Sequence, residues 1–329
     1  MSIIFLLVGI LSIGLQFTAV ESIGVCYGMI GNNLPSRQDV VNLYKSRGIN
    51  QMRIFFPDEP ALQALRGSNI ELILDVAKET LPSLRNANEA TNWVNKYVRP
   101  YAQNVKIKYI SVGNEIKPND NEAQYILPAM QNIQNAISSA NLQGQIKVST
   151  AIDMTLIGKS FPPNDGVFSD QAKPYIQPII NFLNNNGAPL LANVYPYFAY
   201  IGDKVNIPLD YALFRQQGNN AVGYQNLFDA QLDSVYAALE KVGASGVKIV
   251  VSESGWPSAA GDSASTDNAA TYYRNLINHV KNGTPKRPGA IETYLFAMFD
   301  ENQKTGAATE QHFGLFNPDK SPKYQISFN

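Results

Sequence analysis

Three observations on the sequence predict an α/β fold, a single (β/α)8 barrel of the TIM type. Eight short apolar or β-branched runs are typical of strands buried on both faces. Amphipathic stretches with helical spacing alternate with these runs along the chain. No linker, low-complexity tract or charge run divides the 329 residues, so one domain is sufficient. A doubly wound open sheet is the alternative that periodicity alone leaves open.

The elements follow one another in regular order, with a helical or connecting segment after each strand. The expected strands are 23–27, 51–55, 71–76, 107–112, 145–151, 189–194, 247–252 and 290–296. The expected helices are 36–47, 60–65, 90–101, 122–140, 171–185, 224–242 and 267–280. Gly48, Gly187 and Gly243 follow three of these helices, where a left-handed residue ends a helix well. Residues 201–223 form the longest irregular stretch, and we expect a loop beside the active site there.

The first residues differ in character from the rest of the chain. Residues 3–15 are almost wholly apolar, but this run is too short to span a membrane. Small residues follow at Thr18 and Ala19, as a secretory cleavage site requires, although the preceding segment has no Lys or Arg. We therefore predict a signal peptide at residues 1–21 and a mature catalytic domain at residues 22–329, with no membrane attachment after cleavage.

Composition excludes several classes of function. Lys and Arg number 26 against 27 Asp and Glu, so no basic stripe is present to bind nucleic acid or an anionic membrane. The chain has two histidines, which argues against a histidine-rich metal site, and one cysteine, Cys26, which we expect to be a buried core residue. No G-x-S-x-G or P-loop motif occurs. The charge composition therefore indicates an uncharged partner or substrate.

In a barrel of this type, function lies at the C-terminal ends of the strands. Six acidic residues are expected there: Asp75, Glu115, Asp153, Glu253, Asp300 and Glu301. Glu115 and Glu253 each end a buried strand, where loss of water can raise a carboxyl pKa. Such a pair suggests acid/base and nucleophilic catalysis of glycoside hydrolysis. The alternative is that each glutamate only forms a salt bridge at its strand end.

Aromatic and amide side chains near strand ends suit a sugar ligand. Tyr195, Tyr197 and Tyr200 fall within six residues after the sixth strand, and sugar rings stack on such side chains. Trp256, Phe296 and Phe299 follow other strands, although core packing is the competing explanation for them. Asparagines also occur at expected loop positions, where many serve as turn residues: Asn32, Asn33, Asn114, Asn193 and Asn302.

Motifs spread over the whole mature chain resemble the plant endo-β-1,3-glucanases of glycoside hydrolase family 17, the pathogenesis-related group. They begin with Ile23-Gly-Val-Cys-Tyr-Gly28, Gly31-Asn-Asn-Leu-Pro35, Val112-Gly-Asn-Glu115, Leu127-Pro-Ala-Met130 and Ile146-Lys-Val-Ser-Thr150. They continue with Asn193-Val-Tyr-Pro-Tyr-Phe198, Val250-Val-Ser-Glu-Ser-Gly-Trp-Pro257, Phe296-Ala-Met-Phe299, Glu301-Asn-Gln-Lys304 and His312-Phe-Gly-Leu-Phe-Asn-Pro318. Each motif alone is weakly diagnostic, whereas their occurrence together and in order is highly specific.

The resemblance implies an open substrate groove and retaining hydrolysis of internal β-1,3-glucosidic bonds in callose, laminarin or fungal wall glucan, without metal or organic cofactor. It assigns acid/base catalysis to Glu115 and the nucleophile to Glu253. The expected substrate-binding residues are Asn114, Tyr195, Tyr197, Tyr200, Tyr27, Asn32, Phe55, Trp256, Glu292, Glu301 and Lys304. Arg53 is a further candidate cation near the cleft. Phe55 stands where the family usually has tyrosine, which removes one potential sugar contact.

The resemblance also implies a monomer whose partner is a β-1,3-glucan polysaccharide, acting in defence or wall glucan turnover. We expect it to be secreted to the apoplast or cell wall, because the extension that sends some relatives to the vacuole is not seen after Ser327. Two alternatives remain at this point. One is hydrolysis of mixed β-1,3-1,4-glucan, and the other is a glucan-binding protein without activity.

Overall fold

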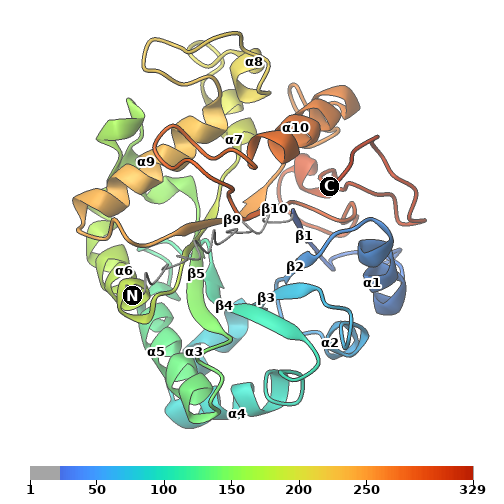
Figure 1. Cartoon of the computed structure of the whole chain (residues 1–329), viewed down its shortest axis with the longest axis vertical. Helices are drawn as coiled ribbons and strands as arrows, with labels where there is room; N and C mark the ends of the chain where they lie inside the picture. Colours follow the sequence, from blue (N-terminus) through green and yellow to red (C-terminus); the bar gives the residue numbers. More distant parts are fainter. Residues whose placement is uncertain (1–22, 329) are drawn as a thin grey trace, which may run out of the picture.

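The computed structural model describes residues 23–328 and has eight parallel strands closed into a barrel, with helices outside the ring (Figure 1). This confirms the predicted fold, and the open-sheet alternative is wrong. Around the barrel the order is β1, β10, β9, β8, β5, β4, β3, β2. Their bounds are Gly24–Cys26 (β1), Gln51–Ile54 (β2), Glu71–Val76 (β3), Lys106–Asn114 (β4), Lys147–Ile152 (β5), Leu190–Asn193 (β8), Ile249–Ser254 (β9) and Thr293–Leu295 (β10). The predicted signal peptide lies outside the described residues.

All eight expected strands are present because each run is apolar enough to be buried on both faces. Apolar side chains from seven of the strands, together with Arg53 from β2, fill the barrel interior, and the outward faces pack under the helices. Cys26 is one of the interior residues, fully buried, and its thiol donates a hydrogen bond to the Ser252 carbonyl at 3.3 Å. The expectation of a core cysteine is confirmed.

All seven expected helices are also present, and their ends follow the capping signals. Ser36 accepts a hydrogen bond from the Asp39 amide at the start of the first helix. Gly48, Gly187 and Gly243 have φ values of 70°, 57° and 78°, the left-handed conformation that ends a helix. The helices are Arg37–Ser46 (α1), Glu59–Ala64 (α2), Ala87–Tyr97 (α4), Ala123–Ser139 (α5), Lys173–Asn186 (α6), Leu227–Lys241 (α9) and Thr266–His279 (α10).

Several shorter elements were not expected from the sequence. They are the α-helices Leu81–Leu84 (α3), Pro196–Gly202 (α7) and Leu209–Ala212 (α8), the 3-10 helices Lys78–Thr80 (η1), Met154–Leu156 (η2), Pro163–Asp165 (η3) and Ala308–Gln311 (η4), and the antiparallel strands Ile157–Lys159 (β6) and Val167–Phe168 (β7). Most lie between a strand and the next long helix. Two of them, α7 and α8, occupy part of the segment after β8, so this segment is more ordered than the expected loop. Within residues 23–328, no helix has the length and apolarity needed to cross a bilayer.

Candidate active site

A cleft of about 940 Å³ lies at the C-terminal ends of the barrel strands, and its walls are the loops that follow them. Both Glu115, which directly follows β4, and Glu253, on β9, line this cleft. Five of the expected substrate-binding residues line it too: Asn114, Tyr195, Phe55, Glu301 and Lys304. The structure therefore brings the two candidate catalytic carboxylates together with much of the predicted site.

Glu115 reaches the cleft because the backbone turns sharply where β4 ends. Gly113 has φ of 85° and Glu115 has φ of 55°, and the register between β4 and β5 shifts at this point. A left-handed glutamate is uncommon and is retained here by the surrounding contacts. The Asn193 side-chain amide donates to Glu115 Oε1 at 2.8 Å. Burial, together with the negative charge of Glu253, raises the pKa of Glu115 to about 7.

Glu253 lies in a different environment, although it is also buried. Its Oε1 accepts a hydrogen bond from Arg53 Nη1 at 2.9 Å, and its Oε2 accepts one from the Tyr195 hydroxyl at 2.7 Å. Burial raises the pKa of Glu253, and the Arg53 charge and the Tyr195 hydroxyl offset only part of that rise. Both donors favour the ionised carboxylate.

The guanidinium of Arg53 is fully buried below the cleft and connects the two glutamates. It forms a two-pronged ion pair with Asp75, with distances of 3.2 and 2.7 Å. Its remaining bonds are to Glu253, Asn114 Oδ1, Asn193 Oδ1 and the Ser252 carbonyl. Because Asn193 also donates to Glu115, one arginine orients groups beside both carboxylates. The expectation of a cation at Arg53 near the cleft is confirmed.

Glu301 and Lys304 form a wall of the cleft together with the segment after β1. Glu301 Oε1 accepts a hydrogen bond from the Ile30 amide at 2.8 Å, and a Cβ on Gly28 would overlap the same carboxyl group. Lys304 pairs with Glu310 at 3.0 Å. Burial acts to lower the pKa of Lys304, but the surrounding carboxylates outweigh it and raise that pKa. The ammonium group thus stays charged beside the cleft.

Aromatic rings line the cleft, but they are not all the ones expected. Phe55 and Tyr195 are both edge-on to Phe296, at centroid distances of 6.1 and 6.2 Å. Phe198 lies 5.3 Å from Tyr195, is 41% exposed and was not among the expected contacts. Phe313 also lines the cleft. In the segment after β8, Phe198 is therefore a ring that is exposed and lines the cleft.

The expectation that Tyr197, Tyr200 and Trp256 contact substrate is wrong, because all three are buried and lie outside the cleft lining. Proline favours the first turn of a helix, and Pro196 begins α7. Tyr197 and Tyr200, three residues apart, then share one face of the helix. This face packs on Trp256, with centroid distances of 5.0 and 6.1 Å. These rings hold α7 on the barrel.

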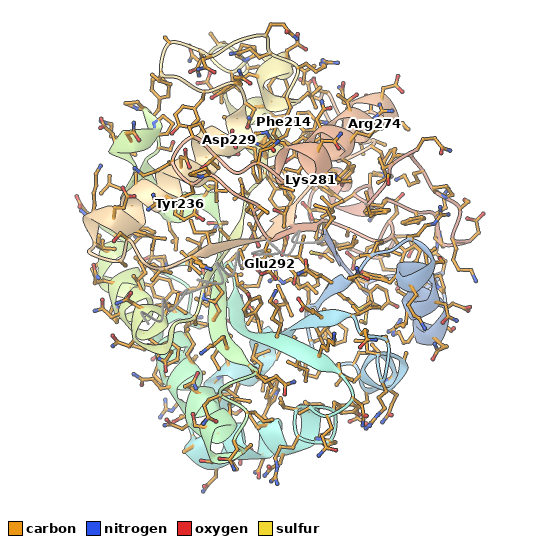
Figure 2. All side chains as sticks on the ribbon, in the orientation of Figure 1. Phe214, Asp229, Tyr236, Arg274, Lys281 and Glu292 are labelled. Atoms are coloured by element: carbon orange, nitrogen blue, oxygen red, sulfur yellow. The ribbon has the colours of Figure 1, made fainter. Side chains whose placement is uncertain are left out.

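The expected position of Glu292 near the cleft is also wrong. Glu292 directly precedes β10, at the opposite end of the barrel, within the ring of strands in Figure 2. Its carboxylate pairs with Lys108 at 3.0 Å and accepts hydrogen bonds from the hydroxyls of Tyr109 and Tyr294 at 3.0 and 3.1 Å. We call these four residues the lower cluster. Because β10 begins directly after Glu292, this residue lies at the N-terminal end of the strands, away from the cleft.

Two further expected contacts lie outside the cleft lining. Tyr27 is buried, and its hydroxyl accepts a hydrogen bond from Arg37 Nη1 at 2.9 Å. Asn32 is exposed and accepts a hydrogen bond from the Asn302 side chain at 2.8 Å. The expectation that Tyr27 touches substrate is therefore wrong, because its side chain is buried, whereas substrate contact by the exposed Asn32 stays a prediction. The residues after β1 that do line the cleft are Gly28, Met29 and Ile30.

Comparison with known proteins agrees with this geometry. Residues 23–328 match the family described as glycosyl hydrolases family 17. A glucan endo-1,3-beta-glucosidase of Vitis vinifera is 60% identical, covering 99% of this chain and 97% of that protein. One of Nicotiana tabacum is 55% identical, covering 99% and 94%.

Two solved structures share the fold of this chain at somewhat lower identity. CJP38, a beta-1,3-glucanase and allergen of Cryptomeria japonica pollen, has a TM-score of 0.91 and 50% identity, covering 94% of this chain and 99% of that one. A structure from a study of two plant beta-glucan endohydrolases with distinct substrate specificities has a TM-score of 0.89 and 43% identity, covering 93% and 100%. This chain is a glycoside hydrolase and belongs to family 17 of the glycosyl hydrolases.

Proposed function

We propose that this enzyme hydrolyses internal β-1,3-glucosidic bonds of β-1,3-glucans with retention of anomeric configuration. The observation that carries the proposal is a pair of buried glutamates in one cleft, of which Glu253 alone is bonded by a guanidinium and a tyrosine hydroxyl. Glu115 has a pKa near neutrality, whereas Glu253 is bound by a guanidinium and a tyrosine hydroxyl. Environments that differ in this way divide the work of acid and nucleophile between two identical side chains. Relatives named glucan endo-1,3-beta-glucosidase support the linkage.

In the first step, Glu253 attacks the anomeric carbon of the glucosyl unit bound between the two carboxylates. The bond from this carbon to the glycosidic oxygen breaks, and Glu115 gives its proton to that oxygen as it leaves. A covalent glucosyl–enzyme ester on Glu253 results. With a pKa of about 7, Glu115 is protonated in mildly acidic solution and can supply that proton.

In the second step, water releases the sugar from Glu253, and Glu115 takes the proton from that water. The ester no longer carries the negative charge of Glu253, and this charge is one cause of the raised pKa of Glu115. The pKa of Glu115 therefore falls once the ester forms. The same side chain is an acid before the ester exists and a base afterwards.

We further propose which residues hold the sugar chain. Asn114 lies beside Glu115 and is fixed by Arg53 and Asn193, and Tyr195 is fixed on Glu253. Glu301 and Lys304 are polar groups on the wall formed by the first and last loops of the barrel. Phe55 and Phe198 offer ring surfaces for stacking, the latter in place of Tyr197 and Tyr200.

The decisive experiment measures reducing-sugar release from laminarin and from barley mixed-linkage glucan, with product anomers followed by proton NMR. We expect release from laminarin, a ladder of short oligosaccharides among the first products, and β-anomers formed first. Preference for barley glucan would favour the mixed-linkage alternative. Release of glucose alone would contradict internal cleavage, and no release from either polymer would favour a binding protein without activity.

We also propose that the mature protein, residues 22–329, is secreted to the apoplast or cell wall as a monomer. The apolar run 3–15 followed by small residues supports this proposal. Its substrates there would be callose or fungal wall glucan, consistent with defence or wall turnover. N-terminal sequencing of secreted material tests it, and a mature chain that still contains residues 3–15 would refute it.

A further inference from the structure

The side-chain amide of Asn193, the last residue of β8, is buried and fully hydrogen-bonded. Asn193 is 1% exposed. Its Oδ1 accepts hydrogen bonds from Arg53 Nη1 at 3.2 Å and from the Ser252 hydroxyl at 2.8 Å. Its Nδ2 donates to Asn114 Oδ1 at 3.0 Å and to Glu115 Oε1 at 2.8 Å. A primary amide has two N–H donors and two acceptor sites on its oxygen, so Asn193 has no bonding position left for a substrate.

Arg53 determines which way this amide faces. A guanidinium can only donate, and Arg53 donates to Asn193 Oδ1 and, at 2.9 Å, to Asn114 Oδ1. Rotation of the Asn193 amide by half a turn would place its Nδ2 against the guanidinium and its Oδ1 against two acceptor oxygens. Because mismatched polar contacts are costly in a buried place, Nδ2 must face Glu115.

The two oxygens of the Glu115 carboxyl group therefore differ. Oε1 accepts the Asn193 N–H, whereas no hydrogen bond from residues 23–328 reaches Oε2. Oε2 is not one of the buried atoms without a partner in this part of the chain, so it is accessible, and Glu115 lines the cleft. A carboxylic acid accepts hydrogen bonds better at its carbonyl oxygen than at its hydroxyl oxygen. The N–H on Oε1 thus favours a proton on Oε2.

We propose that Asn193 is a positioning residue that keeps the proton of Glu115 on Oε2, the oxygen open to the cleft. The proposal rests on the proposed function, in which Glu115 is the acid and then the base. In the first step the proton passes from Oε2 to the glycosidic oxygen, which also keeps the electron pair of the bond that breaks. In the second step the oxygen of a water replaces Glu253 on the anomeric carbon, and a proton of that water passes to Oε2. Asn193 takes part in neither bond change, so its effect passes through Glu115.

The same hydrogen bond influences the titration of Glu115. Burial, together with the negative charge of Glu253, raises the pKa of Glu115 to about 7, and the bond from Asn193 acts in the opposite direction. A carboxylate accepts a hydrogen bond more strongly than the protonated acid does. Loss of the donor should therefore raise this pKa further, and the pH at which activity falls should rise with it.

The test compares kcat/KM on laminarin with kcat/KM on dinitrophenyl laminaribioside, whose leaving group needs no proton. In Asn193→Ala, kcat/KM on laminarin should fall about 10- to 100-fold, part of what a well-placed general acid contributes. On the dinitrophenyl substrate it should stay within about threefold of the wild type, because Glu253 keeps its bonds to Arg53 and Tyr195.

A pH profile gives the second measurement. For Asn193→Ala, the upper limb of kcat/KM on laminarin should move to higher pH by about one unit. Asn193→Asp keeps an oxygen for Arg53 and Ser252 but replaces the N–H with an oxygen and adds negative charge beside Glu115. It should show the same difference between the two substrates and a larger upward shift of the limb.

Asn226→Ala is the matched control. Asn226 is also buried, at 3% exposed, and its side chain also donates to a carboxylate, Asp229 Oδ2 at 2.9 Å, but it lies outside the cleft lining. This variant should lose stability in thermal melts, as Asn193→Ala should. Its kcat/KM on both substrates and the position of its pH limb should stay those of the wild type.

Two results would overturn the proposal. One is an equal loss on both substrates in Asn193→Ala, which would mean that the substitution acts on Glu253 or on the fold, and the other is an upper pH limb that does not move. Asn193→Asp decides the same two questions if Asn193→Ala does not fold. An equal loss on both substrates in Glu115→Ala would refute Glu115 as the acid, and the proposed function with it. A difference between the substrates in Glu115→Ala, but none in the Asn193 variants, would refute the role of Asn193 alone.

Discussion

The two ends of the barrel hold buried charge in different ways, although one strand, β4, contributes to both. β4 carries Lys108 and Tyr109 toward the lower end and Asn114 toward the cleft. In the lower cluster, the carboxylate of Glu292 is bonded by Lys108, Tyr109 and Tyr294 and lines no part of the cleft. At the upper end, Glu115 and Glu253 are also buried and bonded, yet both line a cleft of about 940 Å³.

The difference teaches that a buried carboxylate is not by itself a sign of catalysis. Buried, bonded carboxylates occur both in functional sites and in structural ion-pair networks. What distinguishes the upper end is that its bonded carboxylates also border space for a ligand, and that the two have different hydrogen-bond donors. Five substitutions and one pH profile test this contrast.

Loss of Glu253 should have the largest effect. We expect Glu253→Ala to reduce kcat on laminarin by several orders of magnitude, because the covalent route requires this carboxylate. The fold should persist, since Arg53 keeps its ion pair with Asp75. Circular dichroism provides the control for folding, and a folded variant that retained more than a few per cent of the rate would contradict the assignment.

The titration of Glu115 should limit activity at high pH. This acid must be protonated in the free enzyme, so kcat/KM should fall as the pH rises through about 7, its pKa in the folded protein. In Glu115→Ala, an aryl glucoside with a good leaving group should keep much of its glycosylation rate, and azide should restore turnover. If azide did not restore turnover, the proton donor would be another acid, and Glu301 would be the first to test.

Phe198 and Tyr197 should differ although they are neighbours in sequence. Phe198→Ala removes an exposed ring from the cleft, so KM should rise roughly 3- to 10-fold with little change in Tm, as for other aromatic contacts. Tyr197→Ala leaves a cavity against Trp256 and should cost about 2–4 kcal/mol of unfolding free energy. Initial rates and thermal melts of both variants check this, and a reversed pattern would restore the stacking role to Tyr197.

Glu292 should have the smallest effect on activity. Glu292→Ala leaves Lys108 and two tyrosine hydroxyls without their common acceptor, so the free energy of unfolding should fall by about 1–3 kcal/mol. The kcat/KM of the folded variant on laminarin should stay within about twofold of the wild type. A large fall in kcat/KM at unchanged stability would mean that the two ends are coupled.

Much of the fold could be predicted because each barrel strand is a separate apolar run bounded by turns. The short elements α7 and α8 could not, because their residues show no amphipathic period of useful length. Pro196 was an available signal for the start of α7, and it would have separated the buried Tyr197 from the exposed Phe198. The orientation of α7 about its own axis, rather than the residue type, decides which of these rings faces the cleft.

The candidate site was predictable in outline for a similar reason. A residue at a strand end is fixed by topology, which is why the positions expected for Glu115, Glu253 and Asn114 agree with the structure. Glu292 was placed at the cleft by resemblance, although its position early in the expected strand 290–296 indicated the opposite end. Gln231, which lines the cleft from α9, could not be found at all, because its position depends on how α9 packs on α7 and the β6–β7 hairpin.

Closure of the barrel joins the beginning of the chain to its end. β1 pairs with β10, and the Ile30 amide bonds Glu301, which is 271 residues away in sequence. During synthesis, a chain that has reached residue 290 already carries both Glu115 and Glu253 but has no closed ring and lacks one wall of its cleft. The order of translation thus delays a complete sugar-binding cleft until the last tenth of the protein has been made.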